Sequence, residues 1–148
     1  MGANSFNIGR DGSQITIFDS VAGQVTFNGM ISFDTKARTK ELESENISGT
    51  TVFRFVPNGH EGTFEFDRQD SSVEAYFAQA EANFYAQLPP PTAVITQTIT
   101  ELDGSITQFQ YIGVQLNLTD GGTWKGLDKV NPKVAWKASK KIPLSVGV

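Results

Sequence analysis

Cysteine is missing from this chain of 148 residues, and histidine occurs once. The absence of cysteine excludes a disulfide framework, a thiol nucleophile and a thiolate metal site. The sequence also has no Walker loop and no G-x-S-x-G elbow, which excludes two common motifs of phosphate binding and nucleophilic catalysis. His60 lies in the run Pro57-Asn58-Gly59-His60-Glu61-Gly62, whose composition is that of a turn, and we expect a solvated turn histidine there.

Long apolar runs and basic residues are also scarce. No run approaches the roughly 18 residues that span a membrane, and residues 1–10 lack the apolar core of a signal peptide. We therefore expect no membrane contact, and a protein used or assembled in a cytoplasm. The net charge of −4 and the pI of about 4.9 argue against tight binding to nucleic acid, but not against a surface along which DNA slides.

The chain does contain enough apolar material for a folded domain. Hydrophobic residues make up 39% of the sequence and phenylalanine occurs 11 times, which excludes a disordered chain. The length predicts a single domain over residues 1–148, with residues 1–14 as a polar, Gly-rich N-terminal arm.

Alternating residues predict strands in the first half. We expect a short strand at Ile15–Phe18 and then a long strand over residues 24–34 with one buried face. The apolar positions of this long strand are Val25, Phe27, Gly29, Ile31 and Phe33. Strands are also expected at Thr51–Pro57 and Thr63–Asp67, separated by a turn at Asn58-Gly59.

Charged residues continue the alternation beyond residue 34. The positions are Lys36, Arg38 and Lys40, followed by Glu41, Glu43 and Glu45. They predict a hairpin arm over about residues 34–51 that projects beyond the core, with its tip at Ser44–Gly49. The arm is either a solvated hairpin or a head-to-tail contact, in which the basic stem of one subunit meets acid on the next; contacts of that kind build rings and open stacks.

One helix is predicted at Ser71–Leu88. Ser71 and Glu74 have the spacing of a capping box, and the run Pro89-Pro90-Pro91 ends the helix. A bulky stripe comprises Val73, Phe77, Ala80, Phe84 and Leu88, and a stripe of small residues on the other side comprises Ala75, Ala78, Ala82 and Ala86. Alanine is the best helix former, but a helix that is apolar on two sides is usually covered on two sides. We expect the alanine stripe to contact a neighbouring subunit.

The second half predicts further strands at about Ala93–Leu102, Ser105–Tyr111, Gly113–Thr119 and Lys133–Ser139. The fold class is therefore mainly β, a sandwich or partial barrel with one flanking helix. Trp136 alternates with lysines and should lie in the core with Val134 and Ala138. Trp124 follows a Gly pair in a loop, where it allows an alternative function as a carbohydrate-binding β-sandwich.

Chemistry-bearing residues have simpler interpretations. Glu65 and Asp67 share one strand face and could serve a glycoside hydrolase, but they read more simply as the polar side of the strand. The Asp103-Gly104-Ser105 and Asp120-Gly121-Gly122 runs resemble pieces of calcium loops and read as turns. We expect no catalytic, cofactor-binding or metal-binding residue.

Three segments together resemble the tail tube family of contractile-tailed bacteriophages. One is the Gly-x-x-Gly strand pattern that leads to charged residues and the helix, from Gly59 to Asp70. Another is the helix with its Pro terminator followed by T-I-T-E-L-D-G-S, and the third is D-G-G-T-W-K-G…V-A-W-K-A-S-K-K. The resemblance covers about Gln24–Lys141, and related tubes occur in contractile injection and type VI secretion systems.

The resemblance implies a structural virion protein and not an enzyme. Its inner sheet would join those of neighbours into hexameric rings, and the rings would stack head-to-tail into a tail tube for DNA ejection. The implied partners are further copies of the chain, the tail sheath, the baseplate and the tail terminator, in a virion assembled in the host cytoplasm. DNA would pass without specific binding. A tube of an injection or secretion system is the alternative.

In such a tube, particular residues are expected to face the lumen or to contact neighbouring subunits. If the strands that carry them belong to the inner sheet, Gln24, Thr26, Asn28, Glu65 and Asp67 face the lumen. The contact between rings is expected to involve Lys36, Arg38, Lys40, Glu41, Glu43 and Glu45, and the contact within a ring Ala75, Ala78, Ala82 and Ala86.

Overall fold

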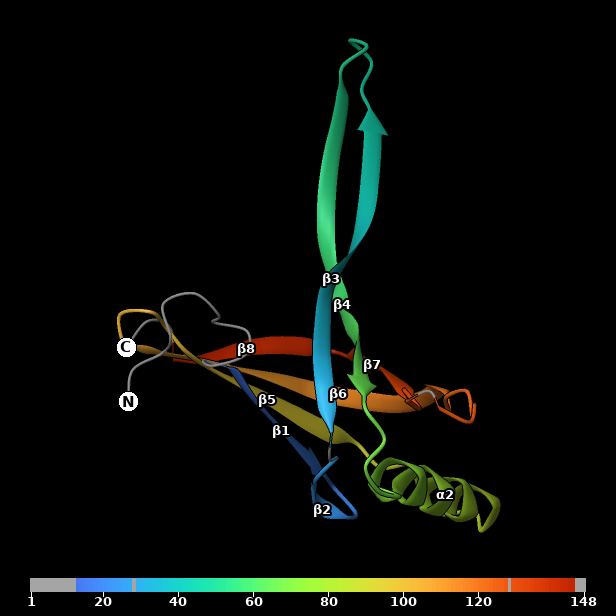
Figure 1. Cartoon of the computed structure of the whole chain (residues 1–148). Coiled ribbons are helices and arrows are strands. Elements are labelled where there is room, and N and C mark those ends of the chain that lie inside the picture. The colour runs from blue at the N-terminus through green and yellow to red at the C-terminus, as the bar shows by residue number, and fades with distance from the viewer. Residues whose placement is uncertain (1–12, 28, 128, 146–148) are drawn as a thin grey trace.

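The computed structural model describes residues 13–27, 29–127 and 129–145. Its strands are β1 (Ser13–Asp19), β2 (Gly23–Val25), β3 (Met30–Glu45), β4 (Thr51–Phe66), β5 (Ala93–Thr100), β6 (Ile106–Asp120), β7 (Lys133–Ala138) and β8 (Lys140–Ser145). The helix α2 spans Ser72–Tyr85. The prediction of a mainly β fold with a flanking helix is confirmed (Figure 1).

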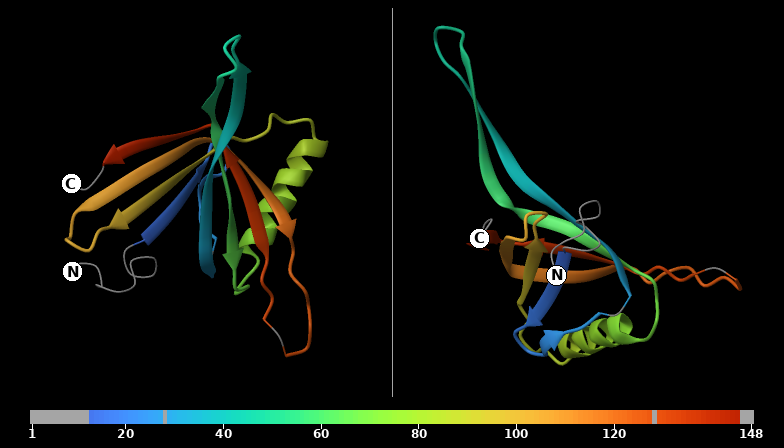
Figure 2. Two further views of the ribbon diagram at one scale, coloured as in Figure 1. Left: turned by 90° about the horizontal axis from the view of Figure 1, so that it is seen from above. Right: turned by 60° about the vertical axis from the view of Figure 1, so that its left-hand side comes forward.

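All strands belong to one antiparallel sheet that bends along β6. The order is β2-β1-β5-β6-β7-β4-β3, and β8 pairs with β6. The N-terminal part of β6 pairs with β5 and β8, whereas its C-terminal part pairs with β7. We call the first half of the sheet (β2, β1, β5, β6, β8) sheet A and the second half (β6, β7, β4, β3) sheet B; they fan apart in Figure 2.

The bend lies at Gly113, whose φ of 66° is left-handed. Across from it, Ser139 separates β7 from β8 and donates its backbone N–H to the carbonyl of Ile112 at 2.9 Å. A Cβ at Gly113 would come within 3.0 Å of the Ser139 Cβ. Glycine therefore permits both the backbone conformation and the close approach.

The core lies between the two halves of the sheet. The ring of Tyr111 from sheet A meets that of Trp136 from sheet B at 4.9 Å, and Phe33 stacks on Trp136 at 5.7 Å. Trp136, Val134 and Ala138 are all buried, which confirms the predicted core face of β7.

Helix α2 covers one end of this core (Figures 1 and 2). Val73 is buried, and Tyr76 and Phe77 both contact the ring of Phe27. The Tyr76 hydroxyl donates a hydrogen bond to the Asp19 carboxylate, whose other oxygen accepts the backbone N–H groups of Val21 and Ala22. Burial and the bond to Asp19 raise the pKa of Tyr76, so the phenol stays protonated and fixes the helix to β1.

The predicted capping box is wrong. The Ser71 side chain makes no cap hydrogen bond; instead an Asp70 carboxylate oxygen accepts the Ser72 N–H at 3.0 Å. Glu74 binds the Arg68 guanidinium through two bonds of 2.7 and 2.8 Å, which lower the pKa of Glu74. The helix also ends earlier than predicted, and Phe84 and Leu88 of the bulky stripe are exposed.

The long strand predicted over residues 24–34 is broken. β2 joins sheet A and β3 joins sheet B, because the chain turns at Gly29, which has a φ of 83°. A Cβ at Gly29 would overlap the carbonyl oxygen of Asp67. A register shift between Met30 and Ser32 accompanies an exposed Ile31. Asn28 and most of the predicted N-terminal arm lie outside the described residues.

The turn predicted at Asn58-Gly59 is also wrong, since β4 runs through it. The register shifts there from Ala37↔His60 to Thr39↔Pro57, which makes a bulge and not a hairpin turn. His60 is consequently a half-buried strand residue whose ring lies 5.8 Å from that of Tyr111. Burial and the nearby Lys141 lower the pKa of His60. Beyond the bulge, β3 and β4 leave the body as a long two-stranded arm (Figures 1 and 2).

Candidate assembly surfaces

The outer face of sheet A carries uncharged polar side chains in adjacent rows. One row joins Thr16, Thr96 and Gln110 across β1, β5 and β6, and the next joins Gln14, Thr98 and Gln108. Within the second row the Gln108 amide donates to the Thr98 hydroxyl at 3.1 Å. Residues opposite one another in an antiparallel pair share a face, so these hydroxyls and amides form a continuous neutral surface, here called the hydroxyl–amide face.

Sheet A is unpaired at both edges within the described residues. On one side β8 pairs with β6 alone. On the other, β2 covers only Ile17–Asp19 of β1, and residues 13–16 have no strand partner opposite β5 among the described residues. Unpaired N–H and C=O groups along an edge are a template for pairing with another chain.

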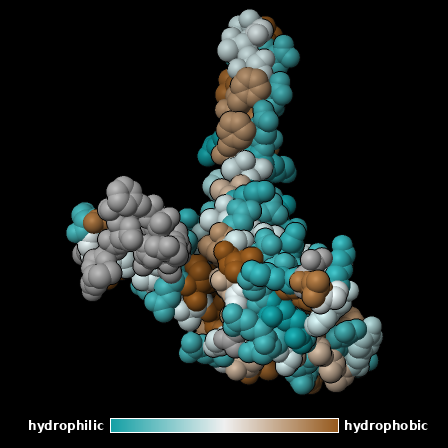
Figure 3. Space-filling view, in the orientation of Figure 1, coloured by the Kyte–Doolittle hydropathy of each residue, from teal (hydrophilic) through white to brown (hydrophobic). Residues whose placement is uncertain are grey.

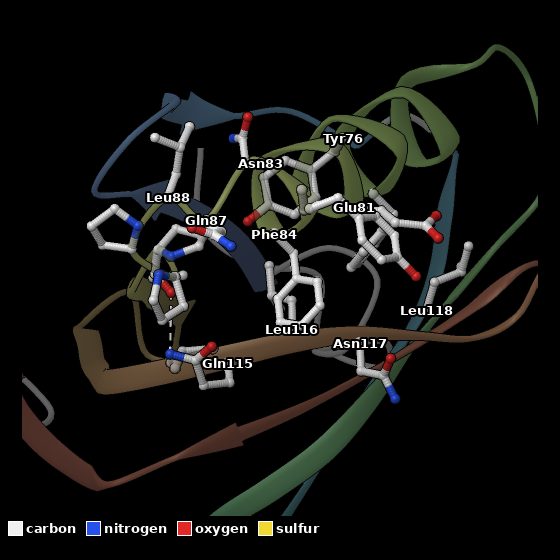
Figure 4. A pocket seen from close by; sticks show the side chains of 18 residues that line it. Tyr76, Glu81, Asn83, Phe84, Gln87, Leu88, Gln115, Leu116, Asn117 and Leu118 are labelled. Atoms are coloured by element: carbon white, nitrogen blue, oxygen red, sulfur yellow. Dashed lines mark hydrogen bonds between the residues drawn. The ribbon is translucent and has the colours of Figure 1, made fainter.

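Helix α2 presents two uncovered surfaces. Ala75, Ala78, Ala82 and Ala86 are all exposed, and no basic residue lies in the last turn of the helix. On its other side, a groove of about 990 Å³ separates the C-terminal half of α2 from β6. Phe84, Leu116 and Leu118 point into the groove (Figure 4), which is also lined by Leu88 and the three prolines that follow it.

The arm carries the residues predicted to contact the next ring. Lys36, Lys40, Glu41, Glu43 and Glu45 are exposed, and Arg38 lies 3.7 Å from Glu61 at the base of the arm. Leu42, Ile47, Val52, Phe53 and Phe55 are also exposed along it. In Figure 3 brown, apolar side chains lie along one side of the arm, next to hydrophilic ones.

The residues predicted to face a lumen do not lie together. Gln24 is opposite Phe18 on the outer face of sheet A, and Thr26 is exposed just after β2. Glu65 pairs with Ser32 and Lys133 in sheet B. Asp67 follows the end of β4, where it accepts a 2.6 Å hydrogen bond from the Asn131 amide and lies 3.6 Å from the Lys129 ammonium.

The remaining candidate residues contact other residues of this chain. Trp124 is exposed under the Arg68 guanidinium, which lies 5.0 Å from its ring centroid. Asp103 accepts the N–H and hydroxyl of Ser105 in a turn, which lowers the pKa of Asp103, and Asp120 accepts the N–H of Gly122. In the described parts of the chain no three His, Cys, Asp or Glu side chains are grouped to hold a metal ion, and none of the helices there has the length and apolarity to cross a bilayer.

Solved structures with a similar fold belong to contractile injection machines. A chain of the sheath–tube complex of the extracellular contractile injection system PVC, in its extended state, has a TM-score of 0.61 at 10% sequence identity, with 90% of this chain and 89% of that chain covered. A chain of the PVC sheath/tube terminator also has a TM-score of 0.61, at 9% identity and with 89% and 94% covered. A chain of the anti-feeding prophage cap, a tube-terminating cap, has a TM-score of 0.59 at 8% identity, with 89% and 88% covered.

These similarities establish a shared fold over nearly the whole chain. No family model matches the sequence, and no curated protein sequence matches it. The fold is thus one that contractile injection assemblies contain, in agreement with the resemblance seen in the sequence.

Sequence reasoning missed the hydroxyl–amide face, although a signal for part of it was present. Thr96, Thr98 and Thr100 alternate with Ile95, Gln97 and Ile99 in a single strand. That period of two placed the threonines on one face. Placing Gln108 and Gln110 of β6 beside these threonines requires the register between β5 and β6, which the sequence alone does not specify.

Proposed function

We propose that this chain is a structural subunit that polymerises into the tube of a contractile machine. Sheet A carries the proposal, because it combines two edges that are unpaired among the described residues with rows of neutral polar side chains on its outer face. Six copies joined edge to edge through sheet A would form a ring with a continuous inner wall. The shared fold with chains of contractile injection assemblies supports the same role.

The hydroxyl–amide face then lines the lumen. Each phosphate that a Lys or Arg neutralises adds salt-dependent affinity for nucleic acid, and exposed aromatic rings hold bases by stacking. The two rows that define this face carry neither basic nor aromatic side chains, so a polymer could slide along them without being held. Phe18 and Lys140 lie on the same face outside these rows. Gln24 belongs to the same face. Glu65 lies in sheet B, and Asp67 directly follows the end of β4, so neither belongs to this face.

The other surfaces supply the remaining contacts. In the proposed ring, the alanine face of α2 packs on the adjacent subunit. The projecting arm reaches a neighbouring ring, so rings stack head-to-tail, and sheath, baseplate and terminator proteins bind the outside and the ends of the tube. The cargo is DNA in a phage virion assembled in a host cytoplasm, or protein in an injection system.

Sedimentation and negative-stain microscopy of the purified chain test this function. We expect rings of six subunits and stacked tubes at high protein concentration. A chain that remains a folded monomer over the whole accessible concentration range would contradict the proposal.

A further inference from the structure

The projecting arm has two faces of opposite charge. Beyond the bulge, Glu41 pairs with Phe55, Glu43 with Phe53 and Glu45 with Thr51. Directly opposed residues point to the same side. We call this the acidic aromatic face; it continues the core face of the hairpin, on which Phe33 pairs with Phe64 lower down.

The other side of the arm is basic and aliphatic. Lys40 pairs with Val56, Leu42 with Arg54, and Ser44 with Val52. We call this the basic aliphatic face. The side chains of Lys36 and Arg38 lie on the same side of the hairpin nearer the body, where Lys36 pairs with Glu61.

Both faces expose apolar side chains that this chain does not cover. Phe53 and Phe55 are 57% and 65% exposed, and Leu42 and Val52 are 46% and 55% exposed. The arm stands away from the body, so none of the described elements forms a second layer over either face (Figure 2). An isolated two-stranded hairpin is marginally stable in water, and a partner that buries these residues would stabilise it.

The charged residues beyond the bulge also form no ion pair with other described residues of the subunit. Among the described residues, no salt bridge involves Lys40, Glu41, Glu43, Glu45 or Arg54. Each face offers what the other lacks: carboxylates can pair with the ammonium and guanidinium groups, and those cations can lie over phenylalanine rings. One face of the arm is therefore complementary in charge to the opposite face of the arm of another copy.

We propose that the acidic aromatic face of one arm packs on the basic aliphatic face of the arm of a second copy. The contact is heterologous, since the two surfaces differ, and it leaves a free face at each end for a further copy. This pairing rests on the proposed function, because it names the surface through which the arms connect subunits of the tube.

Two charge-reversal variants of the full chain test the pairing. Glu41→Lys/Glu43→Lys/Glu45→Lys makes both faces basic, and Lys40→Glu/Arg54→Glu makes both faces acidic. We expect each variant to stay folded, because the core is untouched, and to raise the concentration required for polymerisation at least tenfold. The control Lys125→Glu reverses an exposed charge in the loop after β6, away from the arm, and should polymerise like the wild type.

Mixing the two variants gives the decisive result. In an equimolar mixture each basic face meets an acidic face of the other variant, so we expect polymerisation to return to within about threefold of the wild type. If the mixture stays unassembled while the wild type assembles, the arms bind another surface, such as the groove between α2 and β6, and the pairing is wrong although the tube function stands. If the wild type itself never assembles, the proposed function is wrong and the pairing falls with it.

Discussion

The indole of Trp136 in β7 lies directly across from Gly62 in β4. A Cβ at Gly62 would come within 2.9 Å of the Trp136 Cε2 and would overlap the carbonyl oxygen of Asp34. The absence of a side chain at position 62 thus lets the largest buried side chain of the core lie flat against the sheet.

Gly62→Ala should therefore destabilise the subunit. Overpacking a well-filled core costs about 1–3 kcal/mol, and we expect a loss near the upper end because backbone atoms are in the way. Urea unfolding of the monomeric chain, followed by circular dichroism, measures the change. Gly121→Ala is the control, since nothing lies within 4 Å of a Cβ there; equal stability of the two variants would refute the packing argument.

The C-terminus of α2 predicts a stabilising change. Gln87 has a left-handed φ of 60°, and the bonds Gln87 N–H to Phe84 O and Leu88 N–H to Asn83 O, both 3.0 Å, make a Schellman motif. A non-glycine residue pays about 1 kcal/mol in this conformation, so Gln87→Gly should raise the free energy of unfolding by roughly 0.5–1 kcal/mol. Gln79→Gly, inside the helix, should lower it by about 1 kcal/mol. If Gln87→Gly lowers the free energy of unfolding as Gln79→Gly does, the Schellman motif at Gln87 is wrong.

The ion pair between Arg68 and Glu74 predicts a pH dependence. Hydrogen bonding to Arg68 lowers the pKa of Glu74 in the folded state below 4.5. The pair therefore contributes fully above the unfolded pKa, and its contribution is lost as pH falls through the folded pKa. The two side chains are 27% and 35% exposed, so solvent screening keeps the effect small.

The measurement is the free energy of unfolding between about pH 6 and pH 3, where carboxylates titrate. We expect the wild type to lose more stability over this range than Glu74→Gln. Glu81→Gln, the same substitution elsewhere on the helix, should follow the wild-type curve. Parallel curves for the wild type and Glu74→Gln would show that the pair adds nothing to stability.

The alanine face of α2 predicts a selective loss of assembly. Ala78 and Ala82 are exposed in the single subunit, so Ala78→Arg or Ala82→Arg should leave the monomer folded, while a large charge at a subunit contact blocks ring formation. Circular dichroism and sedimentation together separate the two effects. Thr123→Arg, in the exposed loop after β6, controls for the added charge, and normal rings from both helix variants would place the alanine face in solvent.

Much of the fold was readable from local patterns. The alternation around Trp136 and the period of α2 are side-chain patterns that burial on one face imposes directly. The break at Gly29 and the bulge at Gly59 were not readable, because each depends on a contact with a distant strand: the Asp67 carbonyl in one case and the Ala138 carbonyl in the other. β8 was missed altogether, since Lys140, Lys141 and Pro143 are untypical of a strand.

The candidate surfaces were predicted less completely. The charged residues of the arm were identified, but as a basic stem followed by an acidic end. The register shows that Lys40 and Glu41 also point to opposite sides of the hairpin, and the proposed pairing between arms is based on this separation by face. The hydroxyl–amide face depends on three strands brought together by topology, which no single stretch of sequence encodes.

The central claim is that the hydroxyl–amide face lines the lumen of a tube, and thiol labelling tests it most directly. The chain has no cysteine, so Thr96→Cys and Thr63→Cys each introduce a single thiol, on the outer faces of sheet A and sheet B. In assembled tubes, we predict that a bulky polyethylene-glycol maleimide labels the Thr63→Cys variant and spares the Thr96→Cys variant, while disassembled subunits of both are labelled. Rapid labelling of Thr96→Cys in intact tubes, with protection of Thr63→Cys, would contradict the account.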